Sequence, residues 1–468
     1  MYRFGLVAFL TLNSLWAASG DDTTALHRAV YRDDIEEAKA LLRSGADAKA
    51  ANRYGLTPLF LACTNGNGRM VELLISAGAD PNSKLPGGET ALMTAARTGK
   101  VDAVKALLAH GADVHAKEDR RGQNALMWAA AEGHVEVVKA LIAAGADIHS
   151  TLATGYTPFL LAVREGHIGV AEALLQAGAD VNETIRPREA SGPRPASGAG
   201  APREGTTALH LAVVNAHFEL ASKLLDRGAN PNAVEVGYAP LHIVSWVRKP
   251  GLGDNDPAPR GSGNMNSLEI VKKLVASGAD VNLRMTKKLA VGLTRINTVG
   301  ATPFFLAART GDAELMKALA ALGADPKIPN AEGSTPLMAA AGLGTRSPGE
   351  DAGSESEVVE AVQVALDLGN DINAVDNLGE TAMHSAAYKN LPAVVRLLAA
   401  KGADVNVWNR KNKHGWTPLT IARGYRFGNF KPSPDTVAAI EEVLTKAGVP
   451  IEPPPGPAVT ENKDYRKP

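Results

Sequence analysis

The triplet Gly-Ala-Asp, or a close variant of it, returns along the chain at a nearly constant interval. Its first five glycines are 33 or 34 residues apart, at Gly45, Gly78, Gly111, Gly145 and Gly178. The series continues at wider intervals with Gly228, Gly278, Gly323, Gly369, Gly402 and Gly448. Self-similarity at this period is typical of arrays in which each unit packs only against its neighbours. The 468 residues are therefore predicted to form one elongated array of about eleven repeats between residues 21 and 449.

The repeat at residues 119–147 shows what each unit is expected to form. Asn124 precedes an apolar, Ala-rich stretch and can cap the free N–H groups of a first helix. The apolar residues of 135–144 recur at helical spacing, so they predict a second helix with one buried face. Gly145 can take the left-handed conformation that ends this helix. The pattern therefore predicts turn, helix, turn, helix in every repeat.

These residues resemble the ankyrin repeat, whose pattern is a β-turn, Thr-Pro-Leu-His-x-Ala-Ala, Gly-His, an apolar helix and Gly-Ala-Asp-Val-Asn. Most repeats keep the Thr, and several keep the Pro or the His. The resemblance implies an all-α repeat solenoid of about eleven ankyrin repeats, with β-turn or hairpin fingers between them. The departures are Ala in place of Pro at Ala25, Ala91, Ala125, Ala208 and Ala382, Ala239 in place of Thr, and a retained His only at His27, His210, His242 and His384.

The organisation changes near residue 182. Residues 21–182 carry five regular repeats, 183–204 form a Pro-, Gly- and Ser-rich insertion expected to be flexible, and 205–449 carry repeats six to eleven with further insertions. Residues 284–299 lengthen a turn and are expected to form a β-hairpin finger. Three more insertions lie between the helices of one repeat, at 249–266, 342–356 and 424–435. The Pro-rich, charged residues 450–468 are interpreted as a disordered tail.

Residues 1–20 have the pattern of a secretory signal peptide, with a basic start, a short apolar run and small residues before the expected cleavage position. This predicts an exported protein, periplasmic or secreted, that does not insert into the membrane after cleavage. A retained signal anchor is the alternative. The net charge of −1 provides no overall field for binding nucleic acid. Cys63 is the only cysteine, so no intramolecular disulfide can form.

Catalytic, metal and cofactor motifs are missing from the sequence. There is no His-Glu-x-x-His, no Gly-x-Ser-x-Gly and no cysteine cluster. Six of the eleven histidines fall at the Leu-His and Gly-His positions of the repeat, so we interpret the histidines as structural. The sequence thus predicts a protein with no catalytic residues, no metal site and no cofactor.

The resemblance implies that a partner contacts the turn tips and the exposed end of the first helix of each repeat. At the helix end this chain has Tyr31, Arg97, Arg164, Arg309 and Tyr388. At or beside the turn tips it has Arg53, Tyr54, Arg120, Arg121, Tyr156, Tyr238, His414 and Trp416. Arg, Tyr and Trp are enriched in binding hot spots, so we predict that these thirteen residues bind the partner.

The sequence therefore predicts a monomeric, non-catalytic scaffold that binds a protein partner of unknown identity through its concave face. Two alternatives stay open at this stage. One is an accessory factor or inhibitor of an exported enzyme, and the other is a secreted effector acting on proteins of a foreign cell.

Overall fold

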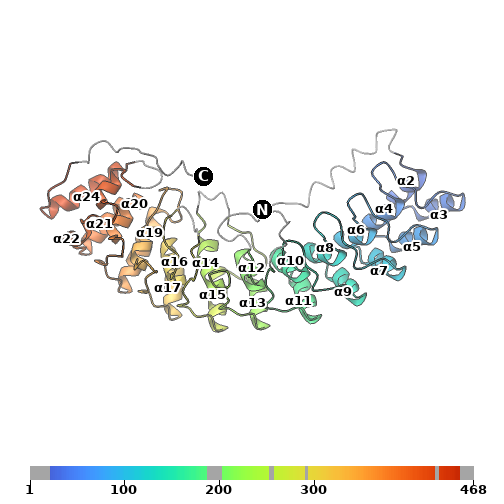
Figure 1. Cartoon of the computed structure of the whole chain (residues 1–468), viewed down its shortest axis with the longest axis horizontal. Helices are drawn as coiled ribbons and strands as arrows, with labels where there is room; N and C mark the ends of the chain where they lie inside the picture. The colour runs from blue at the N-terminus through green and yellow to red at the C-terminus, as the bar shows by residue number, and fades with distance from the viewer. Residues whose placement is uncertain (1–21, 187–202, 252–257, 290–293, 427–431, 454–468) are drawn as a thin grey trace. The chain divides into compact units, whose positions relative to one another are not determined.

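The computed structural model describes residues 22–186, 203–251, 258–289, 294–426 and 432–453 (Figure 1). The predicted signal peptide, most of the insertion 183–204 and most of the tail 450–468 lie outside these residues. Within them, the helices form eleven successive pairs, and the one-turn helix α22 (Val405–Trp408) stands between the last two. The prediction of an all-α repeat solenoid is confirmed.

The first helix of each pair is short and begins at the Thr-Pro or equivalent position. These helices are α2 (Ala25–Tyr31), α4 (Pro58–Asn65), α6 (Ala91–Arg97), α8 (Ala125–Glu132), α10 (Pro158–Glu165), α12 (Ala208–Val214), α14 (Pro240–Arg248), α16 (Pro303–Arg309), α18 (Pro336–Ala340), α20 (Ala382–Lys389) and α23 (Pro418–Ala422). The second helices are α3 (Ile35–Arg43), α5 (Gly68–Ser76), α7 (Val101–Ala109), α9 (Val135–Ala143), α11 (Ile168–Gln176), α13 (Phe218–Asp226), α15 (Ser267–Ala276), α17 (Ala313–Ala321), α19 (Glu355–Asp367), α21 (Pro392–Ala400) and α24 (Pro434–Lys446).

Most first helices start with the side-chain cap that the sequence predicts. The Asn124 carboxamide accepts a hydrogen bond from Met127 N at 2.9 Å, and Thr302 Oγ1 accepts one from Phe305 N at 3.2 Å. Each such bond satisfies a backbone donor that the helix itself cannot. In the seventh repeat, where Ala239 replaces Thr, the ring of His242 accepts a hydrogen bond from Ala239 N at 3.1 Å instead.

The described contacts divide the chain into two compact units. The N-terminal unit comprises residues 1–180 and 185–192, and the C-terminal unit comprises 181–184 and 193–468. In the N-terminal unit, α2, α4, α6, α8 and α10 line one side and α3, α5, α7, α9 and α11 line the other (Figure 1). Ala95, Ala96, Ala129 and Ala130 are fully buried where α6 packs against α8, because small side chains let the helix backbones approach closely.

The C-terminal unit holds six helix pairs and the inserted loops. Its first helices α12, α14 and α16 lie on one side and α13, α15 and α17 on the other (Figure 1). The three insertions between helices follow α14, α18 and α23. In the longer turn at 284–299, where a β-hairpin finger was expected, no strand is assigned to the described residues, and residues 290–293 lie outside them. The Thr298 hydroxyl accepts a hydrogen bond from Leu289 N at 2.7 Å, so a side chain there takes the place of the backbone acceptor of a β-ladder.

Asparagines at the end of the Gly-Ala-Asp-x-Asn motif join consecutive repeats. Asn82 Nδ2 donates to Gly111 O at 3.0 Å, and Asn82 Oδ1 accepts from Asp113 N at 2.7 Å. The same two bonds to the next repeat recur at Asn182, Asn232 and Asn282 in the C-terminal unit. One side chain therefore fixes the register between neighbouring turns.

The glycines of the turns differ in what surrounds them, which allows a matched test. Gly155 and Gly145 both have left-handed backbones, with φ of +83° and +88°. A Cβ at Gly155 would lie 2.3 Å from Arg186 O, whereas one at Gly145 would meet nothing within 4 Å. We expect Gly145→Ala to cost about 1–2 kcal/mol from the backbone alone, and Gly155→Ala to cost more, measured by urea unfolding. Equal losses would show that residue 186 moves aside freely.

Candidate functional site

Three of the predicted binding residues lie at the same place in different repeats of the N-terminal unit. Tyr31, Arg97 and Arg164 are each the seventh residue of a first helix, and each is partly exposed. The repeat geometry therefore places them along one side of this unit, beside the turn tips.

Arg97 is held by two neighbours. Its Nη2 donates to Glu89 Oε1 at 3.1 Å, and its guanidinium lies 5.5 Å from the ring centre of Trp128 in the next repeat. Arg97 Nε and Trp128 Nε1 have no hydrogen-bond partner among the described residues. Trp128 was not among the predicted site residues. A Trp at the variable position of the Leu-His-x-Ala motif, where other repeats have Arg, Leu, Ile, Thr, Ala or Ser, was the signal that could have found it.

Two further arginines of this unit stack on aromatic rings. The Arg164 guanidinium lies 5.1 Å from the ring centre of Tyr156, and its Nε donates to Glu165 at 2.7 Å. The Arg53 guanidinium lies 4.7 Å from the ring centre of its neighbour Tyr54, and both side chains are exposed. Cation–π contacts of this kind orient a guanidinium while leaving its charge in place. Tyr156 itself is buried, so it serves as the platform for Arg164 and offers a partner little surface of its own.

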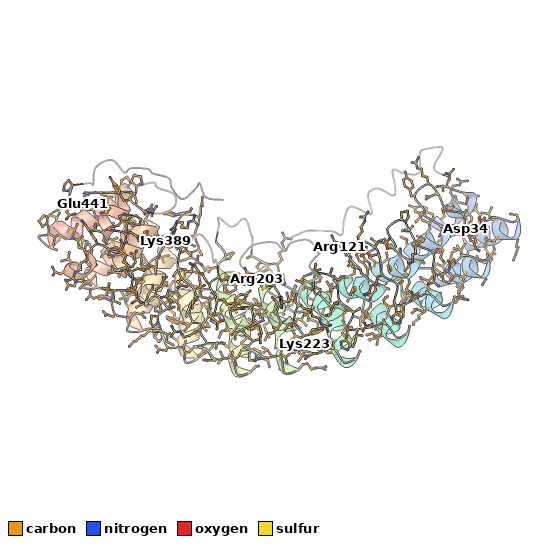
Figure 2. All side chains as sticks on the ribbon, in the orientation of Figure 1. Asp34, Arg121, Arg203, Lys223, Lys389 and Glu441 are labelled. Carbon is orange, nitrogen blue, oxygen red and sulfur yellow. The ribbon has the colours of Figure 1, made fainter. Side chains whose placement is uncertain are left out.

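Arg120 and Arg121 occupy the turn tip before α8, and both are exposed. Figure 2 labels Arg121. The turn is shaped by Glu118, whose carboxylate accepts hydrogen bonds from the backbone N–H groups of Arg120, Arg121 and Gln123 at 2.7–3.0 Å. Partial burial alone would raise the pKa of Glu118, but these three donors outweigh it and lower that pKa. The carboxylate thus fixes the loop that presents both arginines.

The expectation of exposed helix ends is wrong for Arg309 and Tyr388 in the C-terminal unit, since each side chain is only 5% exposed. Arg309 Nη2 donates to Asp351 Oδ1 at 2.7 Å, and Asp351 belongs to the insertion at 342–356. Tyr388 donates its hydroxyl to Glu380 Oε1 at 3.0 Å, while Arg426 bonds to its backbone carbonyl. Residues contributed by the insertions therefore cover both positions.

Tyr238 is also buried, in an aromatic cluster. Its ring meets those of His210 and Trp246 edge to face, with centres 5.8 and 5.4 Å apart. The turn behind it is closed by Thr286, whose N–H donates to Gly237 O at 2.9 Å. Trp246 is partly exposed at the seventh position of α14, where sequence reasoning missed it. His414 and the partly exposed Trp416 do lie at a turn tip, with ring centres 5.0 Å apart.

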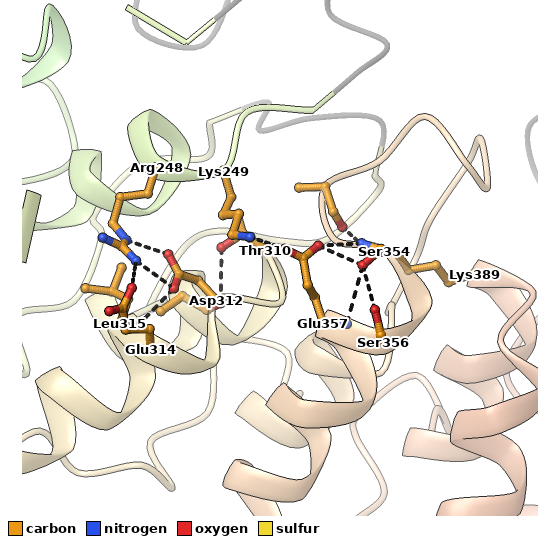
Figure 3. Close-up of polar contacts among 12 residues, drawn as sticks. Arg248, Lys249, Thr310, Asp312, Glu314, Leu315, Ser354, Ser356, Glu357 and Lys389 are labelled. Atoms are coloured by element: carbon orange, nitrogen blue, oxygen red, sulfur yellow. Dashed lines mark hydrogen bonds and ion pairs between the residues drawn. The ribbon is translucent and has the colours of Figure 1, made fainter. Parts of the chain in front are cut away.

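Ion pairs in the C-terminal unit anchor the insertion that follows α14 (Figure 3). Arg248 donates to both carboxylate oxygens of Asp312, at 2.6 and 3.1 Å, and Nη2 also donates to Glu314 at 2.7 Å. Lys249 pairs with Glu357 at the start of α19, in the repeat after next. These contacts join the seventh, eighth and ninth repeats.

Within the described residues, no three His, Cys, Asp or Glu side chains are grouped so as to hold a metal ion. Cys63 is fully buried, and burial raises the pKa of its thiol well above the ordinary range. His210, His242 and His384 are buried, and burial lowers their pKa values to about 4, so they are neutral at pH 7. Across the described ranges, no helix has both the length and the apolar character needed to span a bilayer.

Family models for ankyrin repeats match most of the chain. The three-copy model matches residues 3–85, 78–151, 119–185, 262–347 and 352–429, and the single-repeat model matches residues 204–235.

Curated relatives share the repeats over less than half of this chain. The mouse B-cell lymphoma 3 protein homolog is 29% identical over 223 residues, which are 47% of this chain and 40% of that protein. The human ankyrin repeat and SOCS box protein 16 is 36% identical over 219 residues, with the same two shares. The Arabidopsis thaliana E3 ubiquitin-protein ligase KEG is 27% identical over 246 residues, 45% of this chain and 14% of that protein. The match therefore spans at most 40% of the length of these three relatives.

Proposed function

Because this chain belongs to the ankyrin repeat family, whose members are generally protein-interaction scaffolds, we propose that it binds a protein partner through one surface of its N-terminal unit. The surface, here called the arginine ledge, consists of Arg53, Tyr54, Arg97, Arg120, Arg121, Trp128 and Arg164. The scaffold performs no chemistry of its own in this proposal.

The observation that supports the arginine ledge most is the pairing of its arginines with aromatic rings. Arg53, Arg97 and Arg164 each lie within 5.5 Å of a ring centre, in the second, third and fifth repeats. A guanidinium stacked in this way loses less conformational freedom when a partner binds. The buried counterparts in the C-terminal unit, Arg309 and Tyr388, are already engaged by Asp351 and Arg426 of the chain's own insertions.

The ledge selects a particular kind of partner. Its guanidinium groups carry positive charge, and Glu89 and Glu165 neutralise only part of it. We therefore propose a partner that presents carboxylates, together with pockets that accept the exposed Tyr54 and the partly exposed Trp128. The pattern of residues 1–20 supports an exported location, so the partner is to be sought outside the cytosol.

Charge reversal on the ledge is expected to abolish partner capture. The double variant Arg97→Glu and Arg164→Glu should weaken binding at least about 100-fold, since each hot-spot arginine contributes about 2 kcal/mol or more. The chain is immobilised and exposed to cell-envelope and culture-medium fractions, and retained proteins are identified and titrated.

A control reverses one charge elsewhere in the same unit. Lys105 is exposed on α7, on the opposite side of the N-terminal unit, so Lys105→Glu should leave capture intact (Figure 1). Circular dichroism checks that all variants stay folded. Retention of the same partner by wild type and double variant alike would remove the ledge from the proposal.

A further inference from the structure

The C-terminal unit contains a small cavity with an unusual wall. Its volume is about 120 Å³, and it lies where the turns of the ninth, tenth and eleventh repeats meet the longer turn at 284–299. That is several times the roughly 30 Å³ of one water molecule in the liquid, and less than the about 300 Å³ of the smallest drug-sized pockets. The ionisable side chains in its wall are Arg295, Glu332, Asp376, Glu380, Tyr388 and His414.

Glu380 is the unusual member of this wall, since it is only 4% exposed and half of its carboxylate lacks a partner. Its Oε1 accepts hydrogen bonds from Tyr388 Oη at 3.0 Å and Asn412 Nδ2 at 2.8 Å. Its Oε2 has no hydrogen-bond donor among the described residues. A buried carboxylate oxygen without a donor is costly, and native proteins rarely keep one without a reason.

The neighbouring acid, Asp376, has hydrogen-bond donors on both carboxylate oxygens. Asp376 accepts hydrogen bonds from the N–H groups of Leu378 and Glu380 at 2.8 and 2.9 Å, and from Ser334 Oγ at 2.8 Å. Its carboxylate therefore holds the turn of the tenth repeat and adds negative charge to the cavity. Of the two buried acids in this wall, only Glu380 has a carboxylate oxygen without a donor among the described residues.

We propose that this cavity receives a lysine or arginine side chain of a partner protein, which donates a hydrogen bond to Glu380 Oε2. The inference rests on the proposed function, because the occupant belongs to a protein partner. The cavity accommodates one ammonium or guanidinium group with part of its alkyl chain. Glu332 and Asp376 add attraction, while Arg295 opposes a cation from the other wall.

The ionisation of Glu380 links this binding to pH. Burial raises the pKa of Glu380 to about 7, the charge of Asp376 adds to the effect, and hydrogen bonds from Tyr388 and Asn412 oppose it. His414 has a lowered pKa, because of partial burial and then the charge of Arg295. A cation binds the ionised form of Glu380, so binding at pH 7 releases a fraction of a proton, and affinity rises between pH 6 and 8.

The test uses the full chain and a small probe, so it does not depend on the partner. Nα-acetyl-lysine amide is titrated into the protein by calorimetry at pH 6, 7 and 8, in two buffers with different ionisation enthalpies. We expect one site, millimolar affinity that increases with pH, and proton release at pH 7. The neutral probe Nα,Nε-diacetyl-lysine amide should not bind.

The matched variant is Glu380→Gln, which keeps the acceptor for Tyr388 and Asn412 and removes the charge. It should lower the affinity at least about tenfold and abolish the pH dependence. Equal binding by wild type and variant, equal binding of the two probes, or no binding at all would overturn the inference. If the variant does not fold, the pH dependence and proton release of the wild type decide. None of these outcomes bears on the arginine ledge, whose variants lie in the other unit.

Discussion

Acidification from pH 7 to pH 4.5 is expected to unfold the C-terminal unit through three buried histidines. His210, His242 and His384 have pKa values lowered to about 4 by burial, against about 6.5 in an unfolded chain. Their stabilising effect is complete above pH 6.5 and is lost as the pH falls towards 4. Over that range the three histidines bind protons in the unfolded state but remain neutral in the folded state. Each histidine accounts for about 3 kcal/mol at pH 4.

The shifted pKa of Glu380 changes the stability in the opposite direction. Since its pKa is raised to about 7, the folded state is destabilised at high pH and regains about 3 kcal/mol as the pH falls towards 4.3. The net loss is then about 6 kcal/mol, comparable with the whole stability of an ordinary domain.

Urea unfolding at several pH values, followed by circular dichroism and tryptophan fluorescence, measures this loss. The free energy of unfolding should fall by about 2–3 kcal/mol per pH unit between pH 6 and 5, which corresponds to about two protons. His384→Gln should reduce this slope by about one proton. A free energy that stays flat between pH 6.5 and 4.5 would contradict the prediction.

Removal of the Asp351 carboxylate is expected to destabilise the C-terminal unit by about 3–5 kcal/mol. Asp351 is the buried counter-ion of Arg309, at 2.7 Å, and of Lys389, at 3.9 Å, and it also accepts from Thr345 at 3.2 Å. Burial lowers the pKa of Lys389, and the charge of Asp351 opposes that shift. Asp351→Ala leaves two cations buried without a carboxylate, which costs far more than one lost hydrogen bond.

Glu360→Ala is the matched control, because it removes a carboxylate from the exposed pair with Lys317, in which both side chains are 58% exposed. That pair should contribute less than about 1 kcal/mol. Urea unfolding of both variants at pH 7.5 gives the comparison. Similar small losses in the two variants would mean that water reaches the buried cluster.

The helices were predictable because every repeat encodes them locally. Asn124, the paired alanines and Gly145 each act within a few residues, so their roles follow from spacing alone. The conformation of residues 284–299 could not be predicted in this way. There the Thr298 hydroxyl accepts the hydrogen bond of Leu289 N, and the repeat period gives no indication of that contact.

The predicted site residues also differ in whether their contacts lie within one repeat. Arg164 meets Tyr156 within its own repeat, so the motif already places both residues side by side. Arg309 has the same position in its repeat, yet its partner Asp351 lies 42 residues away in an insertion with no repeat pattern. Whether a helix end is open or covered therefore depends on the fold of the insertions. Sequence position alone could not show that Arg309 and Tyr388 are buried.

The bond between Lys249 and Glu357 passes over a whole repeat, from the end of α14 to the start of α19. In a plain array, tension applied at one end can peel repeats away singly, since each holds only its neighbours. Here the eighth repeat is enclosed between two others that are tied to each other and, through Arg248, to it. Under load, these three repeats would resist together and give way together, so the two ion pairs act as a mechanical clamp on part of the array.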